Sequence, residues 1–99
     1  MPAVALDGGL RVFYANKAMA RLLGRRASEL VGCEWTDLAP AQQVDNARAA
    51  LECALSGTTT RARLAAERPD GIVVALTVSV QRVGEGLFIE VSMATSSRE

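Results

Sequence analysis

The sequence predicts an α+β fold, in which a five-stranded antiparallel sheet has one face covered by short helices and one longer helix. Three observations lead to this prediction. Two short apolar runs surround a turn signal near the amino terminus, helical spacing fills the middle, and alternating runs joined by tight turns end the chain. Strands joined by tight turns must be antiparallel, and strands with one apolar face need helices on that side.

Length and composition indicate one ordinary globular domain over residues 1–99. Apolar residues make up 49% of the chain and charged residues 22%, as in folded proteins rather than disordered tails. Eleven basic and eleven acidic side chains give zero formal charge, so nothing in the overall charge indicates a nucleic acid or a membrane surface as partner. One basic cluster is expected to be a solvated helix face: Lys17, Arg21, Arg25 and Arg26.

No stretch of the sequence indicates export or a membrane span. No apolar run approaches the roughly 20 residues that a bilayer requires. The apolar start at residues 2–6 is short and lacks the basic region of a signal peptide. We therefore expect a cytoplasmic location.

The amino-terminal residues predict a β-hairpin that leads directly into a helix. The Asp-Gly-Gly sequence at 7–9 lies between two apolar runs and is a hairpin turn signal. Leu10, Val12 and Tyr14 alternate, which places them on one face of the second strand. Asn16 stands at the join, where its side-chain oxygen can accept a hydrogen bond from a free N–H of the first helical turn.

Helical patterns then occupy residues 17–57. A short helix ends at Gly24, a further turn ends at Gly32, and a brief helical or irregular piece ends at Pro40. The longest helix covers 41–57 and ends at Gly57. It carries an apolar stripe: Val44, Ala47, Leu51 and Leu55.

The remaining residues predict three strands. The first, 58–67, leads to an Arg-Pro-Asp-Gly turn in which Gly71 takes a positive φ. The second, 72–83, has one face made of Val74, Leu76, Val78 and Val80, and another made of Val73, Ala75, Thr77, Ser79 and Gln81. After a Gly-Glu-Gly turn, the last strand has an apolar face that carries Leu87, Ile89, Val91 and Met93.

These motifs, in this order and spacing, resemble a PAS domain over nearly the whole chain. The matching stretches are DGGLRVFYAN, KAMARLLG, SELVG, WTDLAP, RPDG and the two final strands. The resemblance implies a pocket between the long helix and the inner sheet face, and structural roles for Asn16, Gly32 and Gly71. It also implies a sensory or interaction module that regulates an output domain such as a histidine kinase or a transcriptional regulator. The chain is then one whole domain or a fragment of a larger signalling protein.

We expect no cofactor. The chain has no histidine, which excludes His-ligated haem, the usual zinc sites and any triad that needs imidazole. In the light-oxygen-voltage branch of the family, a photoreactive cysteine lies three residues after the glycine that matches Gly32. Trp35 holds that position here and Cys33 comes two residues too early, so flavin adduct chemistry is not expected.

Two other cofactor arrangements would use a cysteine or amide side chains. Cysteine-ligated haem is disfavoured, because Cys53 points away from the helix stripe and Cys33 lies in a loop. Redox flavin binding without an adduct remains open, although the chain has few aromatic residues to stack on it. The nearby amide side chains are Gln42, Gln43 and Asn46, which a solvated helix start explains equally well.

Two interpretations of the interior remain open. Either a small apolar or weakly polar ligand occupies a pocket there, or the same side chains make a filled core. In the first case Trp35 would line the pocket. In the second it would fill the core under the short helices. The residues concerned are Trp35, Leu38, Val44, Leu51, Leu55, Leu76, Val78 and Ile89.

The residues on the sheet face that the helices do not cover predict a homodimer. A face without helices must meet water, another segment or another molecule, and a helix that often covers it in the family has no counterpart in this sequence. Its mildly apolar patch is expected at Val73, Ala75, Thr77 and Phe88.

In the family, an Asp-x-Thr motif often couples the last strand to the output; Thr95 matches its threonine, but Met93 replaces the aspartate. A ligand-free interaction module is thus the alternative to a ligand sensor, and nothing indicates an enzyme.

Overall fold

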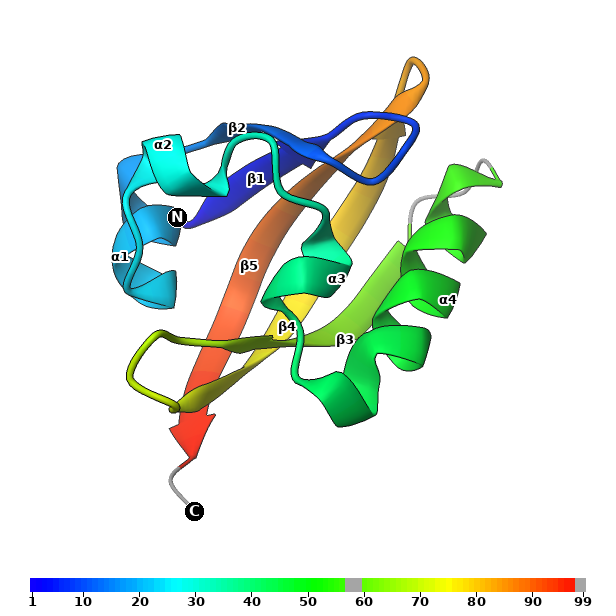
Figure 1. Ribbon diagram of the computed structural model, residues 1–99. Helices are drawn as coiled ribbons and strands as arrows, with labels where there is room; N and C mark the ends of the chain where they lie inside the picture. Colours follow the sequence, from blue (N-terminus) through cyan, green and yellow to red (C-terminus); the bar gives the residue numbers. More distant parts are fainter. Residues whose placement is uncertain (57–59, 98–99) are drawn as a thin grey trace.

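The computed structural model describes residues 1–56 and 60–97, and it confirms the α+β fold with a five-stranded antiparallel sheet (Figure 1). Its elements, in chain order, are β1 (Ala3–Leu6), β2 (Val12–Ala15), α1 (Lys17–Leu23), α2 (Ala27–Leu30), α3 (Trp35–Leu38), the 3₁₀ turn η1 (Ala41–Gln43), α4 (Val44–Leu55), β3 (Thr60–Glu67), β4 (Val73–Val83) and β5 (Gly86–Ser97). The predicted helix end at Gly57 lies outside the described residues.

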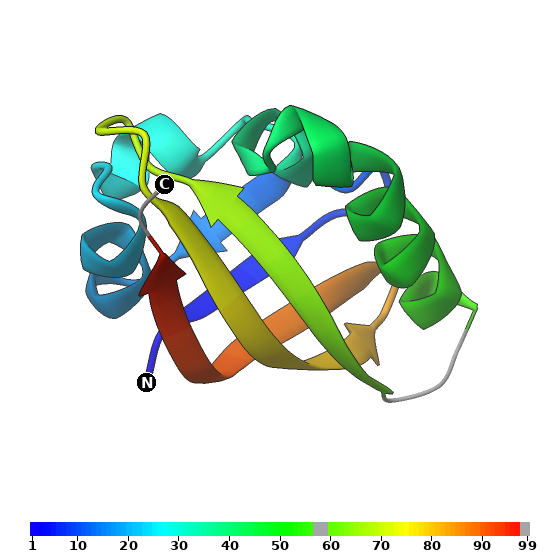
Figure 2. The same ribbon diagram turned by 90° about the horizontal axis from the view of Figure 1, so that it is seen from below.

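The strands lie in the order β2-β1-β5-β4-β3, so the first and last strands of the chain are neighbours at the centre of the sheet. Every neighbouring pair is antiparallel. The helices gather on one side of the sheet, which we call the inner face (Figures 1 and 2). The opposite side, the outer face, carries no helix among the described residues.

One hydrophobic core fills the space between the helices and the inner face. Its largest fully buried side chains come from both layers: Leu6, Met19, Leu23, Leu30, Trp35, Leu51, Leu76, Leu87 and Ile89. The helical layer is therefore held mainly by burial of apolar surface, at about 25 cal/mol per Å². No polar or charged residue is buried in the described part of the chain.

Helix α4 packs on β3 and β4 through a stripe that differs slightly from the predicted one. Ala47, Leu51 and Ala54 are buried. Val44 and Leu55 are only half-buried, because they lie at the two ends of the helix, where the sheet no longer covers them. The alanines on either side of Leu51 let the helix backbone approach the strands closely.

The turn between β3 and β4 forms as its sequence predicts. Gly71 has φ +86°, a left-handed conformation that favours glycine, and its N–H donates to the Arg68 carbonyl at 2.9 Å. The Asp70 carboxylate accepts the Ile72 N–H at 3.0 Å. Gly32, between α2 and α3, also has a positive φ of +96°.

A β-bulge in β2 overturns the prediction that Tyr14 shares a face with Val12. Val12 pairs with Leu6 and Tyr14 pairs with Ala5, so one residue of β2, Phe13, has no partner of its own. Val12 stays on the inner face and is buried, whereas Tyr14 turns to the outer face and is 49% exposed. Strict alternation fails there because a bulge adds one residue to one strand.

A second bulge, in β5, overturns the prediction that Met93 lies on the face of Leu87, Ile89 and Val91. Val91 pairs with Val78 but Met93 pairs with Thr77, which leaves Ser92 as the extra residue. The Ser92 hydroxyl donates to the Thr77 carbonyl at 3.0 Å and so supports the bulge. Met93 consequently lies on the outer face, where it is 64% exposed.

Asn16 joins three elements with one side chain. Its Oδ1 accepts the Met19 N–H at 2.9 Å, which caps α1, and the Ala3 N–H at 3.1 Å, which fixes the start of β1. Its Nδ2 donates to the Met1 carbonyl at 2.8 Å. The role therefore extends beyond a helix cap: Asn16 ties the end of β2 and the start of α1 to the first residues of the chain.

We expect Asn16→Ala to lower the free energy of unfolding by about 2–3 kcal/mol. About 1 kcal/mol corresponds to the lost cap, and the rest to the partly buried Ala3 N–H left without an acceptor. Asn16→Asp is the matched control, because it keeps both accepted hydrogen bonds and should cost less. Chemical denaturation of the three proteins measures the difference, and equal stability of Asn16→Ala and wild type would contradict this role.

Candidate functional site

The residues predicted to line an interior pocket do converge beneath α3 and α4. Trp35, Leu38, Leu51, Leu76, Val78 and Ile89 are all buried and belong to the same core cluster. Leu55 is half-buried against that cluster, and Val44 is half-buried at the start of α4. The six buried residues come from two helices and two strands, so this region couples the helical layer to the middle of the sheet.

Trp35 is the distinctive member of this interior. It is fully buried as the first residue of α3, and its backbone N–H donates to the Leu10 carbonyl at 3.1 Å. Its indole Nε1 is buried and has no hydrogen-bond partner within the part of the chain that the structure describes. A buried donor without an acceptor costs about 1–3 kcal/mol. An acceptor within hydrogen-bonding distance of the indole N–H would remove this cost.

A cavity of about 300 Å³ opens beside this interior, between the β1–β2 turn and α4. Leu10 and Leu55 form its apolar part, and Glu34, Arg48 and Glu52 form its polar part. Leu10 has φ +64°, an uncommon backbone conformation for a branched side chain. Of the predicted pocket residues, Leu55 is the one that reaches this cavity.

The outer face carries an exposed apolar surface at the end of the sheet near β2 and the β4–β5 turn. Phe13 is 59% exposed and Val83 is 60% exposed. Together with half-buried Phe88, they line an open, mainly apolar cavity of about 390 Å³. We use the name outer patch for the apolar side chains of the outer face that are exposed or half-buried: Phe13, Tyr14, Val83, Phe88 and Met93. Met93 lies further along β5 than Phe88, beyond Glu90.

The outer patch only partly coincides with the interface predicted from the sequence. Val73, Ala75, Thr77 and Phe88 do lie on the outer face, in register with Ser97, Thr95, Met93 and Gln81. Thr95 is exposed on this face opposite Ala75. Four residues of the outer patch were missed: Phe13, Tyr14, Val83 and Met93. The two bulges account for Tyr14 and Met93, whereas Phe13 follows from alternation with Val12. Val83 could have been found by extending the alternation of β4 by one step past Gln81.

The described residues show no constellation typical of metal binding. Within residues 1–56 and 60–97, no three His, Cys, Asp or Glu side chains lie together as a metal site would require. The Cys33 thiol is half-buried and donates to the Glu29 carbonyl at 3.2 Å, while Cys53 is exposed on α4. No helix among these residues has the length and apolarity to cross a membrane.

Solved structures with a similar fold come from signalling proteins. A LOV protein from Rhodobacter sphaeroides matches with a TM-score of 0.78 and 19% identity, over 91% of this chain and 57% of that chain. A domain of a sensory box sensor histidine kinase/response regulator from Geobacter sulfurreducens matches with a TM-score of 0.74 and 20% identity, over 89% and 79%. The PAS domain of the quorum-sensing receptor RpfR from Cronobacter turicensis, solved in complex with BDSF, matches with a TM-score of 0.77 and 13% identity, over 89% and 87%.

At these identities the similarity concerns the fold alone. No curated protein sequence matches the chain. The model of one family, described as the PAS fold, matches residues 1–86, which is most of the sequence. Together with the strand order β2-β1-β5-β4-β3 and the helical layer on one face, this match identifies the family. The chain belongs to the PAS fold family.

Proposed function

We propose that this PAS domain is a non-enzymatic signalling module that regulates an attached output domain or a partner through pairing of its outer face with a second copy. The observation that supports this proposal is the outer patch. It combines two aromatic side chains, Phe13 and Tyr14, with Val83 and Met93, and each of the four is about half exposed or more. Exposed apolar side chains gathered on one face are typical of interaction sites.

A second copy is the occupant that this surface suits best. Two outer patches related by a two-fold axis would meet in one self-complementary contact, which closes the assembly at a dimer. The open cavity between Phe13, Val83 and Phe88 would receive an aromatic side chain of the other copy. Because few large anchors are available, we expect a weak or moderate dimer.

Regulation would follow from the position of the patch in the fold. Phe88 lies on β5 between Leu87 and Ile89, which are core residues of the inner face. A change of packing in the core would therefore shift the strand that carries the patch. Thr95, further along β5 on the outer face, would pass the change toward an output domain such as a histidine kinase or a transcriptional regulator.

A second candidate function is recognition of a small ligand in the interior, and the indole N–H of Trp35 supports it. This donor is buried and lacks an acceptor among the described residues, while every neighbour named for the interior is apolar. A small, mostly apolar molecule with one hydrogen-bond acceptor would match that environment. The similar PAS domain of RpfR, solved with BDSF bound, shows that the fold can hold a small ligand.

Phe88→Glu and Phe13→Glu should each shift the native mass toward monomer, with the dimer dissociation constant raised roughly tenfold or more, as for a central interface residue. Val31→Glu is the matched control: Val31 is 48% exposed but follows α2, away from the outer face. Analytical ultracentrifugation measures the three variants beside wild type. A wild type that stays monomeric at high micromolar concentration would contradict the dimer proposal.

Medium-chain aliphatic ketones and alcohols should raise the melting temperature of the wild-type protein and change its tryptophan fluorescence. The change is specific, because Trp35 is the only tryptophan in the sequence. Trp35→Phe keeps an apolar ring but lacks the N–H, so its melting temperature should respond less. An unchanged melting temperature of wild type across such a series would contradict the ligand proposal and leave the dimer proposal standing.

We also propose that the domain acts without haem or flavin. The sequence has no histidine, Trp35 occupies the place of the photoreactive cysteine, and few aromatic residues are present to stack on a flavin. The purified protein should be colourless, without a Soret band and without flavin absorption. An absorbance spectrum tests this directly. Either band at near-stoichiometric amplitude would overturn it.

A further inference from the structure

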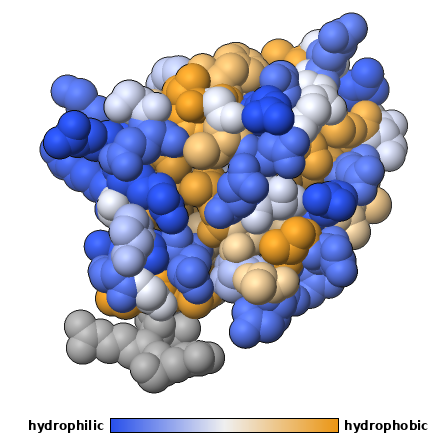
Figure 3. All heavy atoms as spheres, in the orientation of Figure 1, coloured by the Kyte–Doolittle hydropathy of each residue, from blue (hydrophilic) through white to orange (hydrophobic). Residues whose placement is uncertain are grey.

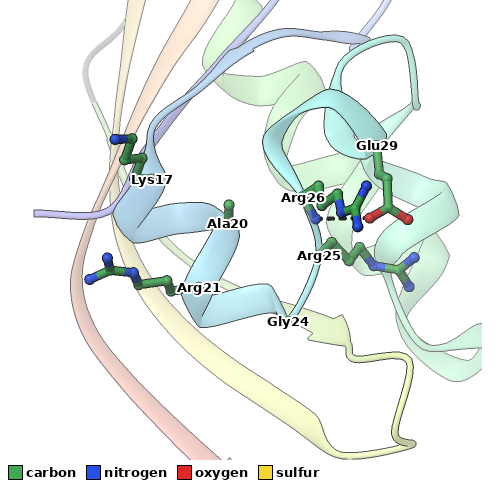
Figure 4. A pocket seen from close by; sticks show the side chains of 7 residues that line it. All are labelled: Lys17, Ala20, Arg21, Gly24, Arg25, Arg26 and Glu29. Carbon is green, nitrogen blue, oxygen red and sulfur yellow. Dashed lines mark hydrogen bonds between the residues drawn. The ribbon is translucent and has the colours of Figure 1, made fainter.

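A basic surface lies at the junction of α1 and α2, away from both the interior and the outer patch. An open cavity of about 490 Å³ lies there, lined by Lys17, Ala20, Arg21, Gly24, Arg25, Arg26 and Glu29 (Figure 4). Hydrophilic side chains gather on the side of the molecule where α1 lies (Figure 3). We call this surface the basic junction.

The cations of the basic junction form no ion pair with a carboxylate in the part of the chain that the structure describes. Among the described residues, ion pairs join Arg11 to Glu34 and Arg68 to Asp70, and none involves the four cations of the junction. The one carboxylate present, on Glu29, accepts the backbone N–H of Arg26 at 3.0 Å and thereby stabilises the first turn of α2 (Figure 4). None of the four positive charges is therefore neutralised by an ion pair among the described residues.

The backbone beneath these charges is fixed. Gly24 ends α1 in a left-handed conformation with φ +65°, and its N–H donates to the Arg21 carbonyl at 3.2 Å. The Arg25 guanidinium donates from Nη2 to the Glu67 carbonyl at 3.2 Å, which ties the junction to the end of β3. The Arg25 Nε is buried without a hydrogen-bond partner in the described structure. The backbone would therefore lose little conformational freedom on binding.

Charge is distributed unevenly around the helical layer, although the whole chain is neutral. Residues 17–29 contain four basic side chains and one acidic side chain, a net charge of +3. Residues 34–52, in α3 and α4, contain four acidic side chains and one basic side chain, a net charge of −3. A positive surface beside a negative one directs a charged partner to a defined place.

From these observations we infer that the basic junction docks an acidic, carboxylate-rich segment of a partner protein. Lys17 and Arg21 point to one side of α1, whereas Arg25 and Arg26 lie on the other side of Gly24 (Figure 4). The charges therefore form an extended surface rather than a socket for one small anion. Nucleic acid fits less well, since no aromatic side chain lines the junction to stack on a base.

A simpler role accounts for only part of this arrangement. Arg21 lies in the last turn of α1, where a cation offsets the negative end of the helix dipole. Lys17 is the first residue of α1, where a cation is unfavourable for the same reason, and Arg26 precedes α2. Helix stability therefore does not explain why three cations besides Arg21 gather at this place.

Fluorescence anisotropy with a labelled glutamate-rich peptide tests the inference on the full chain. The variant Lys17→Gln/Arg21→Gln/Arg26→Gln removes three exposed charges. It keeps Arg25, whose guanidinium donates to the Glu67 carbonyl at the end of β3. Its matched control, Arg48→Gln/Arg63→Gln/Arg82→Gln, removes three exposed charges elsewhere. We expect the first variant to bind roughly tenfold or more weakly than wild type, at about two- to fivefold per charge, and the control to bind nearly as well as wild type. Added salt should weaken wild-type binding.

Four outcomes would overturn the inference. The first is no binding of the glutamate-rich peptide by wild type at low salt. The second is an equal loss of binding in both triple variants, which would show a general charge effect rather than a site. The third is equal binding of a matched lysine-rich peptide. The fourth is tighter binding of a labelled single-stranded oligonucleotide, which would assign the surface to nucleic acid. Thermal melts of both variants establish that each remains folded.

Discussion

A single sheet has two faces, and in this protein the helices cover only one of them. This constraint determines which side chains can form the core. Leu6, Leu76 and Ile89 lie on the covered face and are buried, whereas Met93 and Tyr14 lie on the other face and are exposed. Apolar side chains on an uncovered face have a cost in water, and the pairing of outer faces that we propose would remove it.

The helical layer is fastened to the sheet at both of its edges. At the β2 edge, Gly32 donates to the Val12 carbonyl at 2.7 Å and Trp35 donates to the Leu10 carbonyl at 3.1 Å. At the β3 edge, Arg25 bonds to the Glu67 carbonyl. Asn16 adds a third attachment near the first residues of the chain. A ligand in the interior would contact the helical layer, and so would a partner at the basic junction. Because hydrogen bonds join this layer to the sheet, a movement of the layer would also move the sheet.

Much of this arrangement could be predicted from the sequence, because its patterns are local. The hairpin turn at 7–9, the cap at Asn16 and the alternation in β4 each depend on neighbouring residues only. Most of what escaped prediction depends on contacts across the fold. The bulges at Phe13 and Ser92 are visible only when two strands are paired, and they decide that Tyr14 and Met93 face outward. The missing acceptor of Trp35 and the bond from Arg25 to β3 likewise depend on residues far apart in the chain.

The central claim is that the outer face is the surface through which this domain associates. Two-dimensional ¹H–¹⁵N NMR spectra of the wild-type chain, recorded over a dilution series, test it without any substitution. We predict that the amide signals which move with concentration cluster at Phe13, Tyr14, Phe88 and Met93 and at their neighbours on the outer face, while those of α2 and α4 stay in place. Spectra that do not change with concentration, or shifts confined to the helical layer, would contradict the claim.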